Sequence, residues 1–159
     1  MGSMSPARQC LSRRQAMRRA LNLVNGTTAA GLLVARIGRV PVHRGPGGLL
    51  LAGGWKMPLP HAAAFTVGNV VLYRSRVAPA FDDAPASALL RHEARHSSQY
   101  AVLGLAFLPL YFAAAGYSRL RTGDPASSNI FEVLAGLADG GYRPAPSSRQ
   151  KASYGSFRR

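Results

Sequence analysis

This sequence of 159 residues is poor in cysteine and in acidic side chains. Its single cysteine, Cys10, excludes an intrachain disulfide and a zinc site of the cysteine-rich finger type. Only 6 residues are Asp or Glu, against 20 that are Lys or Arg, so the formal net charge is +14. A charge of this size attracts nucleic acid and anionic membrane surfaces without specificity. We therefore expect nonspecific attraction to such partners, which by itself is no evidence of a binding function.

Three further signals are missing from the chain. No internal repeat occurs, and the arginines are scattered with no nucleic-acid-binding motif among them. The pair Arg13-Arg14 is not followed by a clear apolar segment with a cleavage site, as an export signal would require. We therefore expect a cytoplasmic location, with membrane association as the alternative.

The order of apolar, polar and turn-forming residues predicts an α+β fold that is mostly helical. Residues 1–11 are expected to be flexible, residues 12–142 to form one domain, and residues 143–159 to form a disordered basic tail, since that tail is polar and rich in Pro and Ser. The domain is expected to carry a short β-hairpin or small sheet before its central helix.

The first half of the chain predicts helix and then sheet. Residues 12–37 have helical apolar spacing, with a kink or split near residues 25–28. Residues 49–51 are three leucines between glycines, which is typical of a short buried strand. Residues 65–73 are β-branched and aromatic, and Gly68-Asn69 within them predicts a hairpin turn or a bulge.

The second half predicts two helices and an apolar run between them. Residues 82–85, Asp-Asp-Ala-Pro, are typical of a helix start, and nothing stops that helix before about Gly104. A final helix is expected from Asn129 to about Asp139. Between them, residues 101–117 carry no charge. We predict two buried segments bent at residues 108–109, and the alternative is insertion into a membrane or a hairpin at its interface.

The stretch from Leu89 to Gln99 contains His92, Glu93 and His96 in the pattern H-E-x-x-H. Residues four apart on a helix lie about 5–6 Å from each other on one face, so two imidazoles can reach one metal ion. Glu93 follows the first histidine directly and is placed to accept a proton from a metal-bound water. The pattern therefore predicts a Zn2+ site with His92 and His96 as ligands and Glu93 as general base.

A catalytic zinc site needs a third protein ligand. His43 and His61 lie upstream, and the chain has only one glutamate besides Glu93, which is Glu132. We predict Glu132 as the third ligand. The alternative is that Asn129 and Glu132 form a capping box, in which the carboxylate would bond the backbone at the helix start. Asp139 is either an acceptor for a ligand histidine or a solvated residue at the helix end.

HEARH, followed downstream by NIFEVLAGLAD, resembles the glutamate-type zincin metallopeptidases. The segment from Phe65 to Tyr142 is similar to a small peptidase-like domain of bacterial effector and uncharacterised proteins. This resemblance implies a minimal zincin-like fold, with zinc on His92, His96 and Glu132. It departs at Gly136, where many such peptidases have an acidic residue.

Together these patterns predict a zinc-dependent metallopeptidase that hydrolyses a peptide or protein substrate. Candidates to stabilise the oxyanion are Tyr100, Tyr117, Tyr142 and Arg95, and the sequence does not choose among them. The alternative function is that of a basic protein held on nucleic acid or an anionic membrane, with a structural or vestigial metal site.

Overall fold

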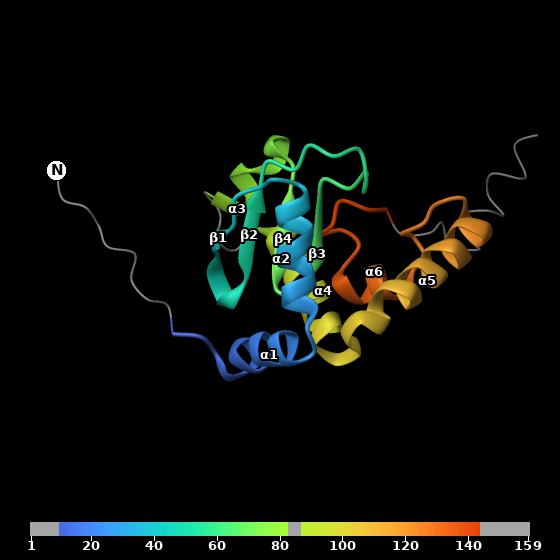
Figure 1. Cartoon of the computed structure of the whole chain (residues 1–159). Coiled ribbons are helices and arrows are strands. Elements are labelled where there is room, and N and C mark those ends of the chain that lie inside the picture. The colour runs from blue at the N-terminus through green and yellow to red at the C-terminus, as the bar shows by residue number, and fades with distance from the viewer. Residues whose placement is uncertain (1–9, 83–86, 144–159) are drawn as a thin grey trace, which may run out of the picture. The chain divides into compact units, whose positions relative to one another are not determined.

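The computed structural model describes residues 10–82 and 87–143 (Figure 1). It confirms the expected α+β class, with helices around a small mixed sheet. The chain divides into two compact units with their boundary between Phe107 and Leu108. That boundary falls inside the range 12–142, and the prediction of a single domain there stays a prediction. The expected mobile ends fall largely outside the described residues.

Two helices open the first unit. Helix α1 spans Arg13–Val24 and helix α2 spans Thr27–Ile37. Ser12 caps α1 in a capping box, because its hydroxyl accepts from the N–H of Gln15 while the Gln15 side chain accepts from the N–H of Ser12. Gly26 has a φ of 78°, which turns the chain between two helices bent by 74°. The predicted split of residues 12–37 is confirmed.

The sheet has four strands in the order β1-β2-β4-β3. Strands β1 and β2 are antiparallel, β2 and β4 parallel, and β3 and β4 antiparallel. The predicted hairpin is confirmed, since β3 and β4 are joined by Gly68 and Asn69 with Gly68 at a φ of 61°. The strands are β1 His43–Arg44, β2 Leu50–Gly53, β3 Ala64–Val67 and β4 Val70–Tyr73, and a 3-10 turn at Pro46–Gly48 lies between β1 and β2.

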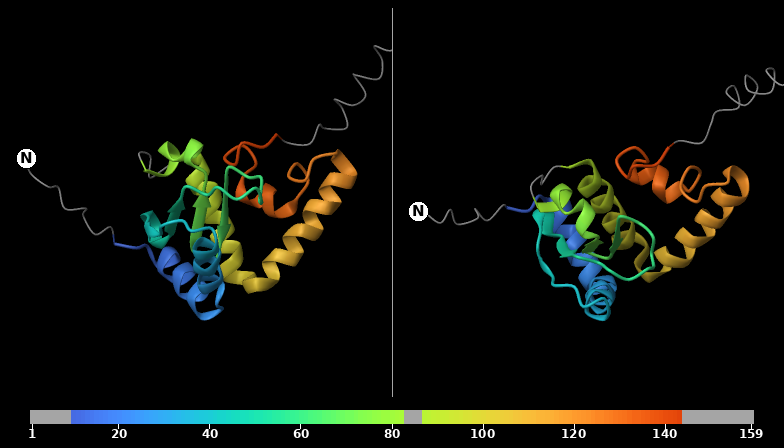
Figure 2. Two further views of the ribbon diagram at one scale, coloured as in Figure 1. Left: turned by 45° about the horizontal axis from the view of Figure 1, so that its top comes forward. Right: turned by 90° about the horizontal axis from the view of Figure 1, so that it is seen from above.

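Every residue of strand β4 is buried, because helices cover both faces of the sheet. On one face α2 lies so close that a Cβ atom at Gly31 would meet Val70 Cγ2 at 2.8 Å. On the other face Val71 packs in a cluster with Phe81 and with Leu90 of α4. Helices α2 and α4 thus lie on opposite sides of the sheet (Figures 1 and 2).

Helix α4, Ala88–Leu103, carries the H-E-x-x-H pattern. Its N-cap is Ser87, whose hydroxyl accepts from the N–H of Leu90. The prediction that this helix starts within residues 82–85 is wrong, because α4 begins after Ser87. Asp82 ends the short helix α3, Pro79–Asp82, which follows a 3-10 turn at Ser75–Val77. Residues 83–86 lie outside the described residues. Ser87 is as good an N-cap as aspartate, so composition alone did not separate the two positions.

A buried polar network fastens α4 to α1 and to the hairpin turn. The Asn22 side chain is fully buried, and its Nδ2 donates to Asn69 Oδ1 and to the Ser97 carbonyl, both at 2.9 Å. Asn69 Nδ2 donates in turn to the hydroxyl of Thr28 at 2.9 Å. Since each of these buried polar groups has a partner, the network holds helix α4 in one register against the hairpin.

Helix α5, Phe107–Thr122, follows a 3-10 turn at Gly104–Ala106. The predicted bend at residues 108–109 is therefore wrong. The chain turns at Gly104, which has a φ of 59°, and Pro109 sits in the first turn of α5, where no helical partner for its missing N–H is required. The prediction of two buried segments is also wrong, since Val102 is 81 % exposed and Phe112 is 67 % exposed.

Within the second unit α6, Ile130–Ala135, folds back beside α5. The Ser118 hydroxyl of α5 accepts from the N–H of Ser128, and Tyr111 of α5 contacts Phe131 of α6. The predicted helix from residue 129 to 139 is too long. Gly136 ends it with a φ of 85°, a conformation that glycine adopts without strain.

Candidate metal centre

Two imidazoles of α4 face each other at the centre of the site. His92 and His96 are buried, and their Nε2 atoms lie 3.1 Å apart with ring planes at 87°. Two nitrogens that each lie about 2.0–2.1 Å from one zinc ion in tetrahedral geometry are about 3.3 Å apart. The spacing of the two nitrogens is therefore close to that of two ligands of one metal ion.

Gln99 sets the orientation of the second imidazole. Its Oε1 lies 2.8 Å from Nδ1 of His96, three residues earlier on α4. A carbonyl oxygen only accepts, so this contact fits the tautomer with the proton on Nδ1 and the lone pair on Nε2, the nitrogen that faces His92. A neutral imidazole with its lone pair on the inward nitrogen is the form that binds a metal ion.

Glu132 reaches the site from α6 and is 2 % exposed. The hydroxyl of Tyr111 donates a short hydrogen bond to its Oε1. A capping box would need the Glu132 carboxylate to accept from the N–H of Asn129. That N–H donates instead to the carbonyl of Ala126, so the capping-box alternative is wrong. Asn129 itself caps α6, with its Oδ1 accepting from the N–H of Phe131.

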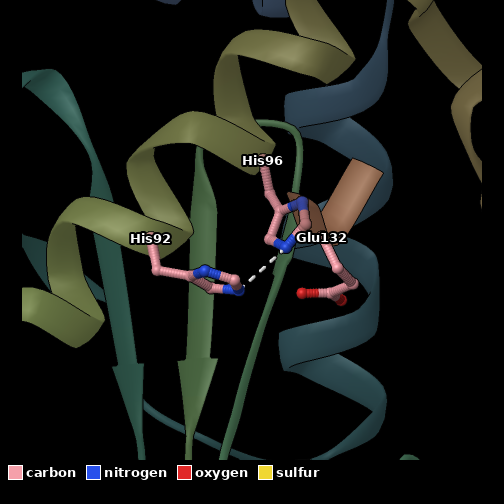
Figure 3. A group of neighbouring side chains, drawn as sticks. All are labelled: His92, His96 and Glu132. Atoms are coloured by element: carbon pink, nitrogen blue, oxygen red, sulfur yellow. Dashed lines mark hydrogen bonds between the residues drawn. The ribbon is translucent and has the colours of Figure 1, made fainter. Parts of the chain in front are cut away.

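The three side chains form a group that could hold a metal ion. One ligand atom from each of His92, His96 and Glu132 lies within 4.8 Å of the others (Figure 3). In the part of the chain that the structure describes, no other group of this kind occurs, and the exposed His43 and His61 are outside it. Two imidazoles and a carboxylate are a donor set that suits zinc. A divalent cation at this place would offset the desolvation of the buried carboxylate.

Glu93, the predicted general base, is also buried, at 3 % exposure. Its Oε2 accepts a hydrogen bond of 2.6 Å from the hydroxyl of Thr66 in strand β3. Thr66 points to α4 because alternate residues of a strand face opposite sides of the sheet. The strand that precedes the motif thus restrains the side chain beside the first histidine.

Three residues whose side chains contact the site were not predicted from the sequence. Gln99 could have been predicted, since it lies three residues after His96 on the same helix face. Thr66 and Tyr111 had none, because a threonine in a strand and a tyrosine in an apolar run are ordinary there. Asp139, considered above as an acceptor for a ligand histidine, lies beyond the end of α6.

The site can be compared with known proteins only through its geometry. The chain matches no protein-family model, no curated protein and no solved structure. The resemblance to zincins therefore remains a prediction from the motif, and the group of His92, His96 and Glu132 is the finding on which a function must be built.

Proposed function

We propose that this protein is a zinc-dependent peptidase, with His92, His96 and Glu132 as ligands and Glu93 as general base. The observation that carries the proposal is the buried group of two imidazoles and one carboxylate with ligand atoms within 4.8 Å of one another. Three protein ligands leave a fourth position of a tetrahedral metal for water, as catalytic sites require and closed structural sites do not.

Zinc suits this site better than a hard cation. Magnesium and calcium take oxygen ligands, whereas two of the three donors here are imidazole nitrogens. When bound, zinc lowers the pKa of a coordinated water to about 7 and polarises a carbonyl group. The protein's own task is then to hold the substrate and to move protons.

Glu93 is the group that we assign to proton transfer. Its carboxylate takes one proton from the attacking water, whose oxygen forms a bond to the carbonyl carbon of the substrate. As the carbon–nitrogen bond breaks, Glu93 gives that proton to the departing nitrogen. The products are a carboxylate and an amine, so one water molecule is consumed per bond. The hydrogen bond from Thr66 holds Glu93 in one position for both transfers.

An extended peptide is the substrate class that fits the sheet. Strand β3 is at one end of the strand order, and its Thr66 contacts Glu93. An edge strand can pair with an extended peptide through main-chain hydrogen bonds. A peptide paired with β3 would run past the residue that contacts the general base.

A second candidate function uses the same ligands without turnover. Position 136, which is acidic in many zincins, is here a glycine that ends α6. This departure favours a metal site that is structural or vestigial in a basic protein bound to nucleic acid or membrane. Both functions predict bound metal, and only the peptidase predicts a role for Glu93 in cleavage.

Metal content tests the site that both functions share. Purified protein should contain about one zinc per chain by elemental analysis. His92→Ala combined with His96→Ala should lose it, whereas His43→Ala combined with His61→Ala is a matched control that should keep it. Substoichiometric zinc in the wild type, or full zinc in the first double variant, would overturn the site.

Cleavage of a fluorogenic peptide library tests the peptidase. Glu93→Gln keeps size and polarity, should retain zinc, and should lower cleavage by about 10²–10⁴-fold, the usual contribution of a general base. Glu132→Gln should lose zinc and activity together. Zinc retained in wild-type protein with no cleavage of any peptide would instead favour the structural site.

A further inference from the structure

One end of the first unit is apolar. The side chain of Asn25, in the α1–α2 turn, donates to the carbonyl of Tyr100 at 3.0 Å and lies 3.8 Å from a Cβ atom built on Gly104. The turn is therefore beside the C-terminal end of α4. Val24 in that turn is 87 % exposed, and Val102 and Leu105 are also exposed. Three large apolar side chains thus face outward at one end of this unit.

Helix α5 continues this apolar character. Successive helical residues turn by about 100°, so the exposed Leu110, Phe112 and Tyr117 spread across about half of the circumference. No Asp, Glu, Lys or Arg occurs between Arg95 and Arg119. A helix in water normally has polar residues on its outer face. The outer face of α5 lacks them over most of its length.

The segment from Ala88 to Thr122 is long and apolar enough to count as a candidate membrane span when α4, the turn at Gly104 and α5 are taken together. Only 11 % of its most apolar window is buried in the protein. A core helix of a soluble domain passes the same test by being mostly buried, which this segment is not. The α1–α2 pair passes the test jointly. Burial in lipid would remove this surface from water.

Positive charges lie where headgroups would be. Arg119 and Arg121 are exposed in the last turn of α5, and Arg121 donates to the hydroxyl of Tyr117 at 2.5 Å. Arginine and tyrosine at the end of an apolar helix are typical of the membrane–water interface. The α1–α2 pair likewise has an uncharged run between arginines, since no charged residue occurs between Arg19 and Arg36.

From these observations we infer that the α1–α2 turn, the C-terminal end of α4 and helix α5 insert into a lipid bilayer with anionic headgroups. The apolar side chains enter the acyl region, and the flanking arginines pair with phosphate groups. The net charge of +14 makes an anionic surface the complementary one. The apolar side chains named here are not among the proposed metal ligands, so the inference goes beyond the peptidase and does not depend on it.

Vesicle flotation of the full chain tests the inference. Protein should float with phosphatidylglycerol–phosphatidylcholine vesicles and stay bound in about 1 M salt, where the Debye length is only about 3 Å. Phe112→Asp should lower the partition coefficient by about tenfold or more, because it removes a large apolar group from the acyl region. Leu59→Asp is the matched control: Leu59 is 65 % exposed, Phe112 is 67 % exposed, and the control should bind as wild type.

A second measurement does not depend on a disruptive variant. Cys10→Ser combined with Phe112→Cys places one environment-sensitive fluorophore on α5, which should shift to the blue with vesicles and be quenched by lipids brominated in the acyl chain. His92→Ala with His96→Ala should bind vesicles as wild type, which separates this inference from the metal site. Binding abolished by salt, a fluorophore that stays in water, or self-association without vesicle binding would each overturn it.

Discussion

The hydroxyl of Thr66 donates a 2.6 Å hydrogen bond to Oε2 of Glu93, so strand β3 and helix α4 meet at the proposed general base. The same hydroxyl lies 3.3 Å from the backbone carbonyl of Glu93. Because both residues are buried, this bond is shielded from water and restrains the carboxylate. The hairpin before the motif helix is therefore part of the site.

Thr66→Val tests that restraint, since it removes the hydroxyl and keeps the shape. A buried carboxylate that loses its donor should cost about 1–3 kcal/mol in the free energy of unfolding, measured with urea. Zinc content should not change, whereas kcat/KM should fall by about tenfold, because the base is no longer held in one position. Thr66→Ser should restore both quantities. Wild-type cleavage by the valine variant would show that Thr66 does not position Glu93.

Gln99 is expected to tune metal affinity through His96. Gln99→Met keeps a long, flexible side chain and removes the acceptor for the ring N–H. Groups in this position typically contribute 10–100-fold in affinity, so the dissociation constant for zinc, measured by chelator competition, should rise by about that factor. Ser98→Ala on the exposed side of the same helix is the control. Equal affinities in both variants would refute the role.

Tyr111 is expected to orient Glu132. Tyr111→Phe removes the hydroxyl that donates to this buried carboxylate, and zinc affinity should fall by about tenfold. Tyr117→Phe, six residues later on α5, removes an exposed hydroxyl that accepts from Arg121, and it should leave affinity unchanged. If both tyrosine variants bind zinc like the wild type, the hydrogen bond has no part in metal binding.

A small pH effect is expected from Asp124 in the loop before α6. Hydrogen bonds from the hydroxyl and the N–H of Ser127 hold the pKa of this carboxyl below its usual range. The stability that they add is present above the pKa of an unfolded aspartate and is lost as the pH falls through the lower folded pKa. Because Asp124 is exposed, the effect should stay below about 1 kcal/mol. Asp124→Asn should remove this part of the acid-side slope in urea unfolding, as should Ser127→Ala.

The closeness of His92 and His96 was predictable because it depends only on local helix geometry, and Glu132 was chosen by elimination. His92 and His96 are four apart on one helix, and Glu132 was the only other glutamate in the chain. The structure brings these three together. The hairpin at Gly68-Asn69 was equally readable, since it needs only a two-residue turn between β-branched runs.

What the sequence did not predict depends on contacts between distant segments. Ser87 caps α4, although aspartate, found at residues 82 and 83, is an equally good cap by residue type, so the local sequence did not decide where the helix begins. The run from residue 101 to 117 is equally compatible with a protein core and with lipid, because both are apolar; only the fold shows that Val102 and Phe112 are exposed. Tyr111 became a partner of Glu132 because α6 folds back beside α5.

The buried network around Asn22 supplies the last prediction. Asn22→Ala leaves Asn69 Oδ1, the Ser97 carbonyl and the Thr27 hydroxyl each without one hydrogen bond in a buried place. Each such loss is expensive, so the free energy of unfolding should fall by about 2–4 kcal/mol in urea. Leu23→Ala, at the next position and exposed, should change it by less than about 0.5 kcal/mol. Since the network also fixes the register of α4 against the hairpin, Asn22→Ala should weaken the Thr66–Glu93 contact and lower kcat/KM at temperatures where the variant is still folded. Unchanged stability would mean that water replaces the lost partners.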